Sequence, residues 1–216
     1  MLSLKKFVFN PFLENTYLIW DTETLEAMIV DPGCSDSNEE KELFDFIEKN
    51  NLIPKYLVNT HCHIDHILGV NSVLKRYKIK YLIPEEDLPL LNMAVSQAEM
   101  FGLQIDTIAN PDEYLKEDFV MKLGDQIIRC LFTPGHTPGE FCLYSEQNKV
   151  CITGDVLFNQ SIGRTDLWGG NYSQLIESIK SKLLTLPDDV TIFPGHGEYS
   201  TIGEEKKLNP FLVNNI

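Results

Sequence analysis

Short segments with alternating apolar and polar residues fill the start of the chain, and this two-residue period is typical of β-strands with one buried face. They cover residues 4–9, 15–20 and 27–30. The turn sequence Asp31-Pro32-Gly33 follows the last of them, and the apolar residues then take helical spacing from Ser37, which can cap a helix that ends at Asn50. A β-α-β alternation is completed by a strand over 55–59, a helix over 67–77 and a strand over 79–83.

The remainder of the chain repeats this order of strands and then helices, without repeating the sequence. A helix is expected over residues 85–101, followed by an irregular segment to residue 117. Strands return from residue 119, with turns at 124–125, 134–139 and 147–148 and a strand over 150–153. The last expected elements are a helix over 172–186, a strand over 191–193 and a helix over 204–208. Each set of strands needs cover for its apolar face, which predicts two packed sheets with helices outside, in a single domain over residues 1–216.

Composition and charge narrow the class of protein. Hydrophobic residues make up 43% of the 216 residues, which is enough for one large core. The formal net charge of -14 opposes binding to nucleic acid, because that affinity comes largely from Lys and Arg. The chain shows neither the apolar stretch of a signal peptide nor a run of about 18 apolar residues, so we expect a cytoplasmic protein without a membrane partner.

Five cysteines are scattered along the chain, an odd number that does not suggest a disulfide framework. Cys62 stands between His61 and His63, but in an extended segment its side chain should point away from theirs. We therefore interpret Cys62 as a packed thiol and not as a metal ligand.

All five histidines of the chain lie in three short motifs, and this concentration is the strongest functional signal in the sequence. The motifs are Thr60-His61-Cys62-His63-Ile64-Asp65-His66, Pro134-Gly135-His136-Thr137-Pro138-Gly139 and Pro194-Gly195-His196-Gly197. A lone histidine is by default a core or surface residue, but imidazole is also the most common protein ligand for zinc-like ions. The number of motifs, and the glycines and carboxylates beside the histidines, favour metal binding.

The spacing supports a site for two metal ions. His61 and His63 are two residues apart, so both rings can face the same side of an extended segment and bind one ion. Asp65 and His66 follow where the chain turns toward a helix, which can direct them at a second ion. Three more candidates each follow a strand, namely His136, Asp155 and His196. The two carboxylate oxygens of Asp155 can bridge ions about 3.5–4 Å apart. Spacing alone leaves open how the other ligands divide between the ions.

These motifs resemble those of the metallo-β-lactamase superfamily, and specifically its glyoxalase II-like (hydroxyacylglutathione hydrolase) branch in the short, single-domain bacterial form. The resemblance spans the chain and is carried by Asn-Pro-Phe-Leu-Glu-Asn-Thr-Tyr-Leu-Ile-Trp over residues 10–20, Val30-Asp31-Pro32-Gly33, Gly154-Asp155-Val-Leu-Phe, Gly163-Arg164-Thr165-Asp166 and Pro194-Gly-His196-Gly-Glu-Tyr-Ser-Thr-Ile-Gly. It implies an α/β fold, the four-layer αβ/βα sandwich of the metallo-β-lactamase fold. It also implies that Asp31 orders the ligand loops; the alternative for Asp31 is a turn-making residue before Pro32-Gly33. The implied division of ligands is His61, His63 and His136 on one ion and Asp65, His66 and His196 on the other, with Asp155 bridging.

The activity that the resemblance implies is hydrolysis of a small acyl thioester, such as S-lactoylglutathione, by a metal-bound hydroxide that Asp65 orients. The expected cofactors are two divalent ions, with zinc (Zn) first and iron or manganese compatible with the same ligands. The same ligand set suits a lactonase or another ester hydrolase, so that alternative stays open. A second alternative is a persulfide dioxygenase of the same fold, which has a similar Gly-Arg-Thr-Asp loop but uses a single iron held by two histidines and an aspartate.

The chain departs from full-length glyoxalase II in two places. We expect the helical glutathione-binding domain of those enzymes to be missing after His196, and Asp166 stands where they usually have a tyrosine. Arg164 is the candidate contact for a substrate carboxylate, or else a clamp that pairs with Asp166 or with a backbone carbonyl. The candidate pocket walls are Phe12, Phe158 and Trp168, whereas helix packing is expected for Met93, Met100 and Phe101.

Overall fold

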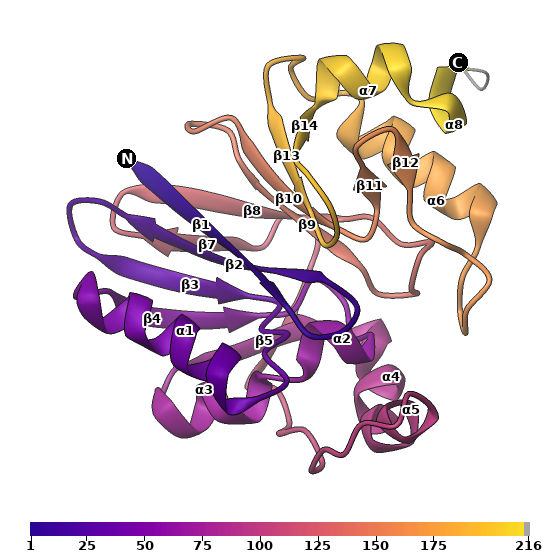
Figure 1. Ribbon diagram of the computed structural model, residues 1–216. Helices are drawn as coiled ribbons and strands as arrows, with labels where there is room; N and C mark the ends of the chain where they lie inside the picture. Colours follow the sequence, from indigo (N-terminus) through magenta and orange to yellow (C-terminus); the bar gives the residue numbers. More distant parts are fainter. Residues whose placement is uncertain (214–216) are drawn as a thin grey trace. The chain divides into compact units, whose positions relative to one another are not determined.

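The computed structural model describes residues 1–213, so residues 214–216 of the expected single domain lie outside the described part of the chain (Figure 1). The chain forms two compact units. The amino-terminal unit comprises Met1–Tyr114 with Lys122–Gln126, and the carboxy-terminal unit comprises Leu115–Met121 with the chain from Ile127 onward. Within residues 1–213 the strands form two six-stranded sheets and a small hairpin.

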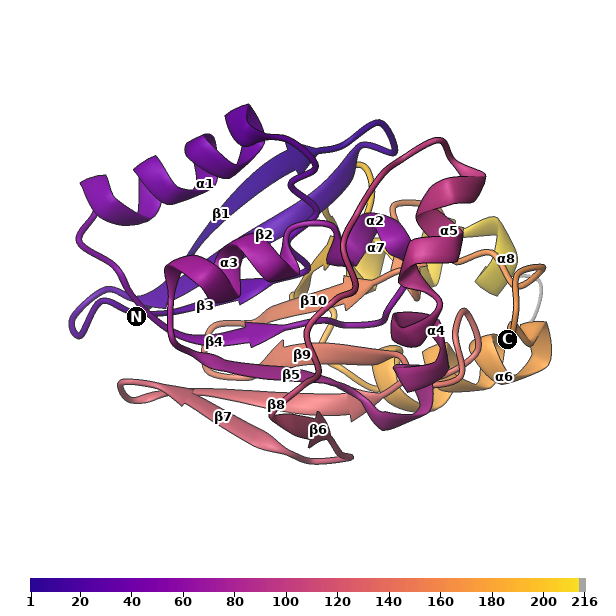
Figure 2. The ribbon, with the colours of Figure 1, turned by 90° about the horizontal axis from the view of Figure 1, so that it is seen from below.

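The first sheet has the strand order β1-β2-β3-β4-β5-β6 (Figure 2). Its strands are β1 (Leu2–Phe9), β2 (Glu14–Asp21), β3 (Glu26–Val30), β4 (Ile53–Val58), β5 (Lys80–Pro84) and β6 (Glu113–Leu115). β1, β2 and β3 pair antiparallel, whereas β3, β4 and β5 run parallel. The expected strands of the first third are therefore present, each within two residues of its expected bounds, and β6 lies in the segment that was expected to be irregular.

Helices of the amino-terminal unit pack on this sheet through apolar residues at helical spacing. α1 (Ser37–Lys49) buries Leu43 and Ile47, which belong to one apolar cluster with Leu18 and Ile29 of the sheet. Figure 1 shows α1 and α3 (Val70–Arg76) on the same face of the sheet. The helical spacing read from the sequence thus identifies the buried face of α1.

The start of α1 differs from the expectation by one residue. Asp36 caps the helix, because its carboxylate accepts the N–H groups of Asn38 at 2.7 Å and Glu39 at 3.0 Å. Ser37, the expected cap, is the first residue of the helix itself. Asp and Ser are both good caps, so the local sequence does not choose between them.

Two expected helices are divided. The helix over 67–77 is α2 (Ile64–Ile67) followed by α3, because Gly69 between them donates its N–H to the Pro32 carbonyl at 2.7 Å. A Cβ on Gly69 would lie 2.2 Å from Cys34 Sγ, so the break is closely packed. Asp65 and His66 consequently lie inside α2 and not in a turn before a helix. The helix over 85–101 is a 3-10 turn (Glu85–Asp87), α4 (Leu88–Asn92) and α5 (Ala94–Met100).

The second sheet has the strand order β14-β13-β10-β9-β8-β7. Its strands are β7 (Val120–Leu123), β8 (Gln126–Phe132), β9 (Phe141–Ser145), β10 (Val150–Gly154), β13 (Thr191–Pro194) and β14 (Ser200–Thr201). β10 pairs parallel with β13 and antiparallel with β9. β11 (Leu157–Phe158) and β12 (Ser161–Ile162) form the separate hairpin. The segments that carry the remaining candidate ligands follow β8, β10 and β13.

Helices of the carboxy-terminal unit pack on strands of the same unit. α6 (Tyr172–Ser178) continues into a π-helical turn (Ile179–Leu183), and Leu175 and Ile179 share an apolar cluster with Cys151 and Ile192. α7 (Ile202–Leu208) and α8 (Pro210–Val213) follow. The helices expected over 172–186 and 204–208 are confirmed, whereas β11, β12, β14 and α8 are too short to give a periodic signal. No helix in residues 1–213 is long and apolar enough to cross a membrane.

Candidate functional site

Four of the seven expected ligands lie together in the amino-terminal unit, just after β4. His61 and His63 present ring nitrogens within 4.8 Å of each other, and the rings of His61 and His66 have centroids 4.1 Å apart. One carboxylate oxygen of Asp65 lies 3.7 Å from His66 Nε2. His61 and His66 are fully buried, whereas the Asp65 side chain keeps 15% exposure. Imidazole nitrogens and a carboxylate thus converge within this unit.

Asp31 contacts this ligand segment directly. Its carboxylate accepts hydrogen bonds from the N–H of Thr60 at 2.7 Å and from the Thr60 hydroxyl at 2.6 Å. Asp31 Oδ2 also lies 3.2 Å from His66 Nδ1. Because Asp31 is buried, its carboxylate fixes one side of the His66 ring and directs Nε2 toward Asp65.

Glu14 and Asp87 are further buried carboxylates at these ligands, and the sequence analysis missed both. Glu14 Oε1 lies 3.9 Å from His66 Nδ1, and burial raises the pKa of Glu14 well above its ordinary value. Asp87 accepts the N–H of Cys62, between the first two histidines, at 3.0 Å. Glu14 lies in the segment 10–20 that carries the family resemblance, but nothing there points to this contact, and Asp87 stands in a segment that reads as ordinary helix.

Cys62 has the surroundings of a packed thiol. The residue is fully buried, and burial raises the pKa of its thiol well above the ordinary value. All five cysteines are free and buried. A thiol with a raised pKa is a poor source of the thiolate that metal binding requires.

The other three expected ligands lie together in the carboxy-terminal unit. Asp155 Oδ2 is 3.5 Å from His136 Nε2 and 3.6 Å from His196 Nε2. The Nδ1–H of His136 donates to the main-chain carbonyl of Arg164 at 2.7 Å, which orients the ring with Nε2 toward Asp155. One carboxylate therefore faces two imidazoles.

Main-chain packing holds the loops that carry these three residues. The carbonyl of Gly154 accepts the N–H of Gly195 at 2.7 Å, so the segment before His196 is bonded to the segment before Asp155. A Cβ at Gly163 would lie 1.8 Å from the carbonyl oxygen of Asp155. Any side chain at position 163 would therefore displace Asp155, which accounts for the glycine.

Arg164 and Asp166 form a two-point ion pair at the surface of this unit. Arg164 donates from Nε and Nη2 to the two carboxylate oxygens of Asp166, each at 2.8 Å. The side-chain hydrogen bonds from Arg164 lower the pKa of Asp166 to about 2. The side chains are 60% and 69% exposed, so solvent competes for both partners. This pair is the clamp that the sequence analysis gave as the alternative to a substrate contact.

The three aromatic residues expected to line a pocket have different neighbours. The Phe158 ring lies 6.3 Å from the His196 ring, between centroids. Trp168 is 53% exposed. Phe12 packs edge-on against Phe101, with ring centroids 5.0 Å apart. Among the three, Phe158 therefore has the direct contact with a candidate ligand.

The expectation of helix packing is wrong for two of the residues near the end of α5. Met100 is 82% exposed and Phe101 is 57% exposed, because α5 buries Ala94 and Ala98 and ends at Met100. Met93, before α5, is at 36% exposure. Apolar character alone does not show which face of so short a helix is covered.

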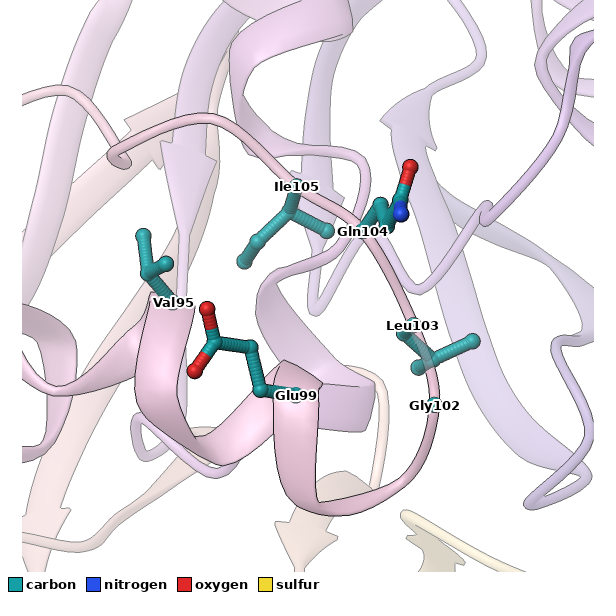
Figure 3. Close-up of a pocket in the computed structure, with 6 residues that line it drawn as sticks. All are labelled: Val95, Glu99, Gly102, Leu103, Gln104 and Ile105. Atoms are coloured by element: carbon teal, nitrogen blue, oxygen red, sulfur yellow. The ribbon is translucent and has the colours of Figure 1, made fainter.

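A cavity of about 380 Å³ lies beside the same helix (Figure 3). Its lining residues are Val95, Glu99, Gly102, Leu103, Gln104 and Ile105. None of the candidate ligands is among them. The cavity is therefore separate from the residues that carry the candidate chemistry.

The donor atoms of both units suit a divalent transition metal. Imidazole nitrogen and carboxylate oxygen are ligands that Zn, Fe and Mn accept. In each unit an outer hydrogen bond or carboxylate orients a histidine, as Asp31 does for His66 and the Arg164 carbonyl does for His136. Histidines held in this way are typical of metal sites.

Comparison with known sequences shows extended similarity. The chain matches the family model described as Metallo-beta-lactamase superfamily over residues 9–196. It is 41% identical over 205 residues to the hydroxyacylglutathione hydrolase GloC of Haemophilus influenzae, with 94% of each chain covered. It is 30% identical over 202 residues to the mitochondrial persulfide dioxygenase ETHE1 of Homo sapiens, which covers 92% of this chain and 71% of that protein.

Solved structures give a matching result. The crystal structure of the BLEG-1 B3 metallo-beta-lactamase has a TM-score of 0.88 at 33% identity, covering 97% of this chain and 99% of that one. The crystal structure of TTHA1623 in a di-iron-bound form has a TM-score of 0.86 at 33% identity, covering 96% of this chain and 100% of that one. Both similarities extend over nearly the whole of the compared chains.

Proposed function

Because this chain belongs to the metallo-beta-lactamase superfamily, we propose that it is a metal-dependent hydrolase that cleaves a small acyl thioester such as S-lactoylglutathione. The observation that carries the proposal is the clustering of His and Asp ligands in each unit. The substrate class comes from the similarity to the hydroxyacylglutathione hydrolase GloC, which extends over 94% of both chains. Retention of every ligand position favours an enzyme over a binding module without chemistry.

In this proposal the two units act together as one catalytic domain, and their ligands share two divalent ions. The proposed division is His61, His63 and His136 on one ion and Asp65, His66 and His196 on the other, with Asp155 bridging. We propose zinc for both positions, with iron as the alternative because the related TTHA1623 is known in a di-iron-bound form. When bound, the ions would activate a water molecule for attack and polarise the thioester carbonyl.

Asp65 is the proposed catalytic carboxylate. It would accept a hydrogen bond from the attacking water and hold that water in line with the carbonyl carbon. Two observations support this role. The Asp65 side chain keeps 15% exposure, so water reaches it, and Asp31 fixes the neighbouring His66 from its Nδ1 side.

Arg164 is the proposed contact for a carboxylate of the substrate. Its guanidinium has the two-point geometry that carboxylates accept, and Asp166 now uses that geometry. A substrate carboxylate would replace Asp166, and the exposure of both side chains keeps the cost of exchange small.

We also propose a cytoplasmic location and a small-molecule substrate. Nucleic acid is not proposed as a partner, because the net charge of the chain is strongly negative.

A persulfide dioxygenase is the second candidate function. It is favoured by the 30% identity with human ETHE1 over 92% of this chain. A persulfide dioxygenase of this fold is expected to use a single iron held by two histidines and an aspartate. Several of the candidate ligands in this chain would then have no role. Metal count and oxygen consumption therefore separate the two candidates.

Metal analysis followed by a substrate panel tests the proposal. The purified full-length chain should hold two divalent ions and hydrolyse S-lactoylglutathione or an uncharged acyl thioester. The panel also contains a lactone and glutathione persulfide, the latter followed with an oxygen electrode. One iron per chain with oxygen uptake would replace the hydrolase with a dioxygenase, and a preference for the lactone would replace the thioesterase with a lactonase.

The role of Arg164 is tested with two substrates that differ in charge. Arg164→Gln should lower kcat/KM for S-lactoylglutathione up to about fivefold, because an exposed ion pair contributes about 0.2–1 kcal/mol. An uncharged acyl thioester should be affected less than twofold. The matched control is Arg76→Gln, which removes another exposed arginine–carboxylate pair, with Glu48. Equal losses on both substrates would show that Arg164 is a structural clamp.

A further inference from the structure

Glu140 is a fully buried carboxylate that no sequence motif singled out. Its Oε1 accepts the main-chain N–H of Asp155 at 2.7 Å. Its main-chain carbonyl accepts the N–H of Thr133 at 2.9 Å, and Thr133 is the first residue of the segment that leads from β8 to His136. Glu140 therefore bonds to two ligand segments of the carboxy-terminal unit at once.

The third ligand segment of this unit joins the same series of bonds. Gly154, directly before Asp155, accepts the N–H of Gly195, directly before His196, at 2.7 Å. The series runs from Thr133 through Glu140 and residues 154–155 to Gly195. In the same unit Asp155 Oδ2 lies 3.5 Å from His136 Nε2 and 3.6 Å from His196 Nε2. A shift of Glu140 would move the residue on which both imidazoles converge.

A hydrogen-bond acceptor alone does not explain the choice of a glutamate. A neutral amide or hydroxyl would satisfy the same N–H with a smaller desolvation cost, because a buried carboxylate needs compensation by positive charge. A divalent ion on Asp155 supplies such charge. A carboxylate behind a ligating residue also raises the affinity of the ligand for a cation.

We propose that Glu140 is a positioning residue of the metal centre, which holds Asp155 through its N–H and strengthens cation binding through its negative charge. The inference rests on the metal centre of the proposed function but not on the substrate. It predicts that the affinity for metal falls when Glu140 changes, whether or not the protein cleaves thioesters.

Glu205 offers a matched control within the same unit. It is also a fully buried glutamate, and its Oε2 accepts the main-chain N–H of Gln160 at 2.9 Å. Asn209 Nδ2 donates to the same carboxylate at 2.8 Å. Its bonded partners are not candidate ligands, so loss of its charge reports the general cost of changing a buried carboxylate.

The experiment measures Zn²⁺ affinity of the metal-free full-length chain by competition with a chromophoric chelator. Glu140→Gln keeps an oxygen that can accept the Asp155 N–H but removes the charge, and it should weaken Zn²⁺ binding about tenfold. Glu140→Ala removes the acceptor as well. It should weaken Zn²⁺ binding toward the upper end of the roughly 10–100-fold range that is typical for residues hydrogen-bonded to metal ligands. Glu205→Gln should stay within twofold of the wild type. Circular dichroism of the metal-free proteins checks that each variant folds, and the absorption spectrum of Co²⁺ bound to Glu140→Gln should differ from the wild-type spectrum.

Wild-type Zn²⁺ affinity in Glu140→Gln would overturn the proposal, as would an equal loss in Glu205→Gln. A wild-type chain that binds no divalent ion would overturn the metal centre and this inference together. Tight metal binding without thioesterase activity would instead overturn the proposed substrate alone and leave the role of Glu140 standing.

Discussion

At the scale of single residues, Asp155 has the most demanding position among the candidate ligands. One of its oxygens faces two imidazoles at 3.5 Å and 3.6 Å, its N–H is held by Glu140, and its carbonyl lies against Gly163. A residue constrained at its side chain and at both main-chain groups has little freedom to shift. Replacing Asp155 should therefore have a large effect on metal binding at this site.

Asp155→Ala should lose both proposed metal ions and hydrolysis together, because the proposed function has this carboxylate bridging the two ions. Inductively coupled plasma mass spectrometry of the purified variant gives the metal content, and the thioester assay gives the activity. Asp189→Ala, which changes an exposed aspartate paired with Lys149, is the control and should keep both. A variant with full metal content would contradict the bridging role.

The candidate ligands could be read from the sequence, whereas the residues behind them could not. His61, His63 and His66 are near neighbours in the chain, between the end of β4 and the end of α2, and this short separation keeps them together. Glu14 and Asp87 reach the same segment from distant positions, and Asp87 acts on a main-chain N–H that has no sequence signature. Contacts to main-chain groups depend on tertiary packing, which periodicity does not encode.

At the scale of secondary-structure elements, the turn between β2 and β3 is closed by Asp21. Its Oδ1 accepts the N–H of Thr24 at 2.8 Å and of Glu23 at 3.1 Å. The hydrogen bond from the Thr24 main chain is the largest of the effects that lower the pKa of Asp21 from 3.8 to about 2. The ionised carboxylate is therefore the form that stabilises the turn.

The stability contributed by Asp21 should be present above pH 4 and decline as the pH falls from 4 toward 2, because the pKa is lower in the folded state than in the unfolded one. Asp21→Asn should accordingly be less stable at pH 7 and should depend less on pH between 4 and 2. Urea unfolding at several pH values measures this. Asp45→Asn, at an exposed ion pair with Lys41, should change stability less, and equal effects would contradict the role of the main-chain hydrogen bonds to Asp21.

The strands of the first third and the first helix followed their sequence pattern closely, but the divided helices and the shortest strands did not. Periodicity over residues 67–77 and 85–101 correctly predicts helical structure and cannot reveal breaks. The break at Gly69 is made by a bond to the Pro32 carbonyl, a residue far away in sequence. Met100 and Phe101 were misassigned for a related reason, since the covered face of α5 is set by its neighbours and not by its own composition.

At the scale of the whole molecule, the family and the fold class were predictable from short motifs. The metallo-β-lactamase fold expected from the sequence is confirmed by the family match over residues 9–196 and by solved structures at TM-scores of 0.88 and 0.86. The motifs identify the fold through their resemblance to those of the superfamily, whereas strand and helix patterns alone indicate only two packed sheets with helices outside. The substrate was less predictable, because Arg164 and Asp166 occupy an exposed loop where many side chains are compatible with the fold.

Metal removal should lower the thermal stability of the whole chain. Ions that bind the folded state alone, present at about 1,000 times their dissociation constant, contribute about 4 kcal/mol. For a chain of this size that corresponds to a change in Tm of roughly 8–16 °C. Calorimetry with EDTA and then with added Zn²⁺ measures the difference. An unchanged Tm would contradict a tightly bound metal centre.

The loop that begins at Gly163 contains one position that must remain glycine and several positions whose side chains can be replaced. Position 163 tolerates no side chain beside Asp155, and the bond to His136 comes from the main chain of Arg164, which any residue provides. The side chains of Arg164, Asp166 and Trp168 are all more than half exposed. Directed evolution of a new substrate preference should therefore keep Gly163 and diversify positions 164, 166 and 168. Substitutions there should change substrate selectivity without displacing the candidate metal ligands.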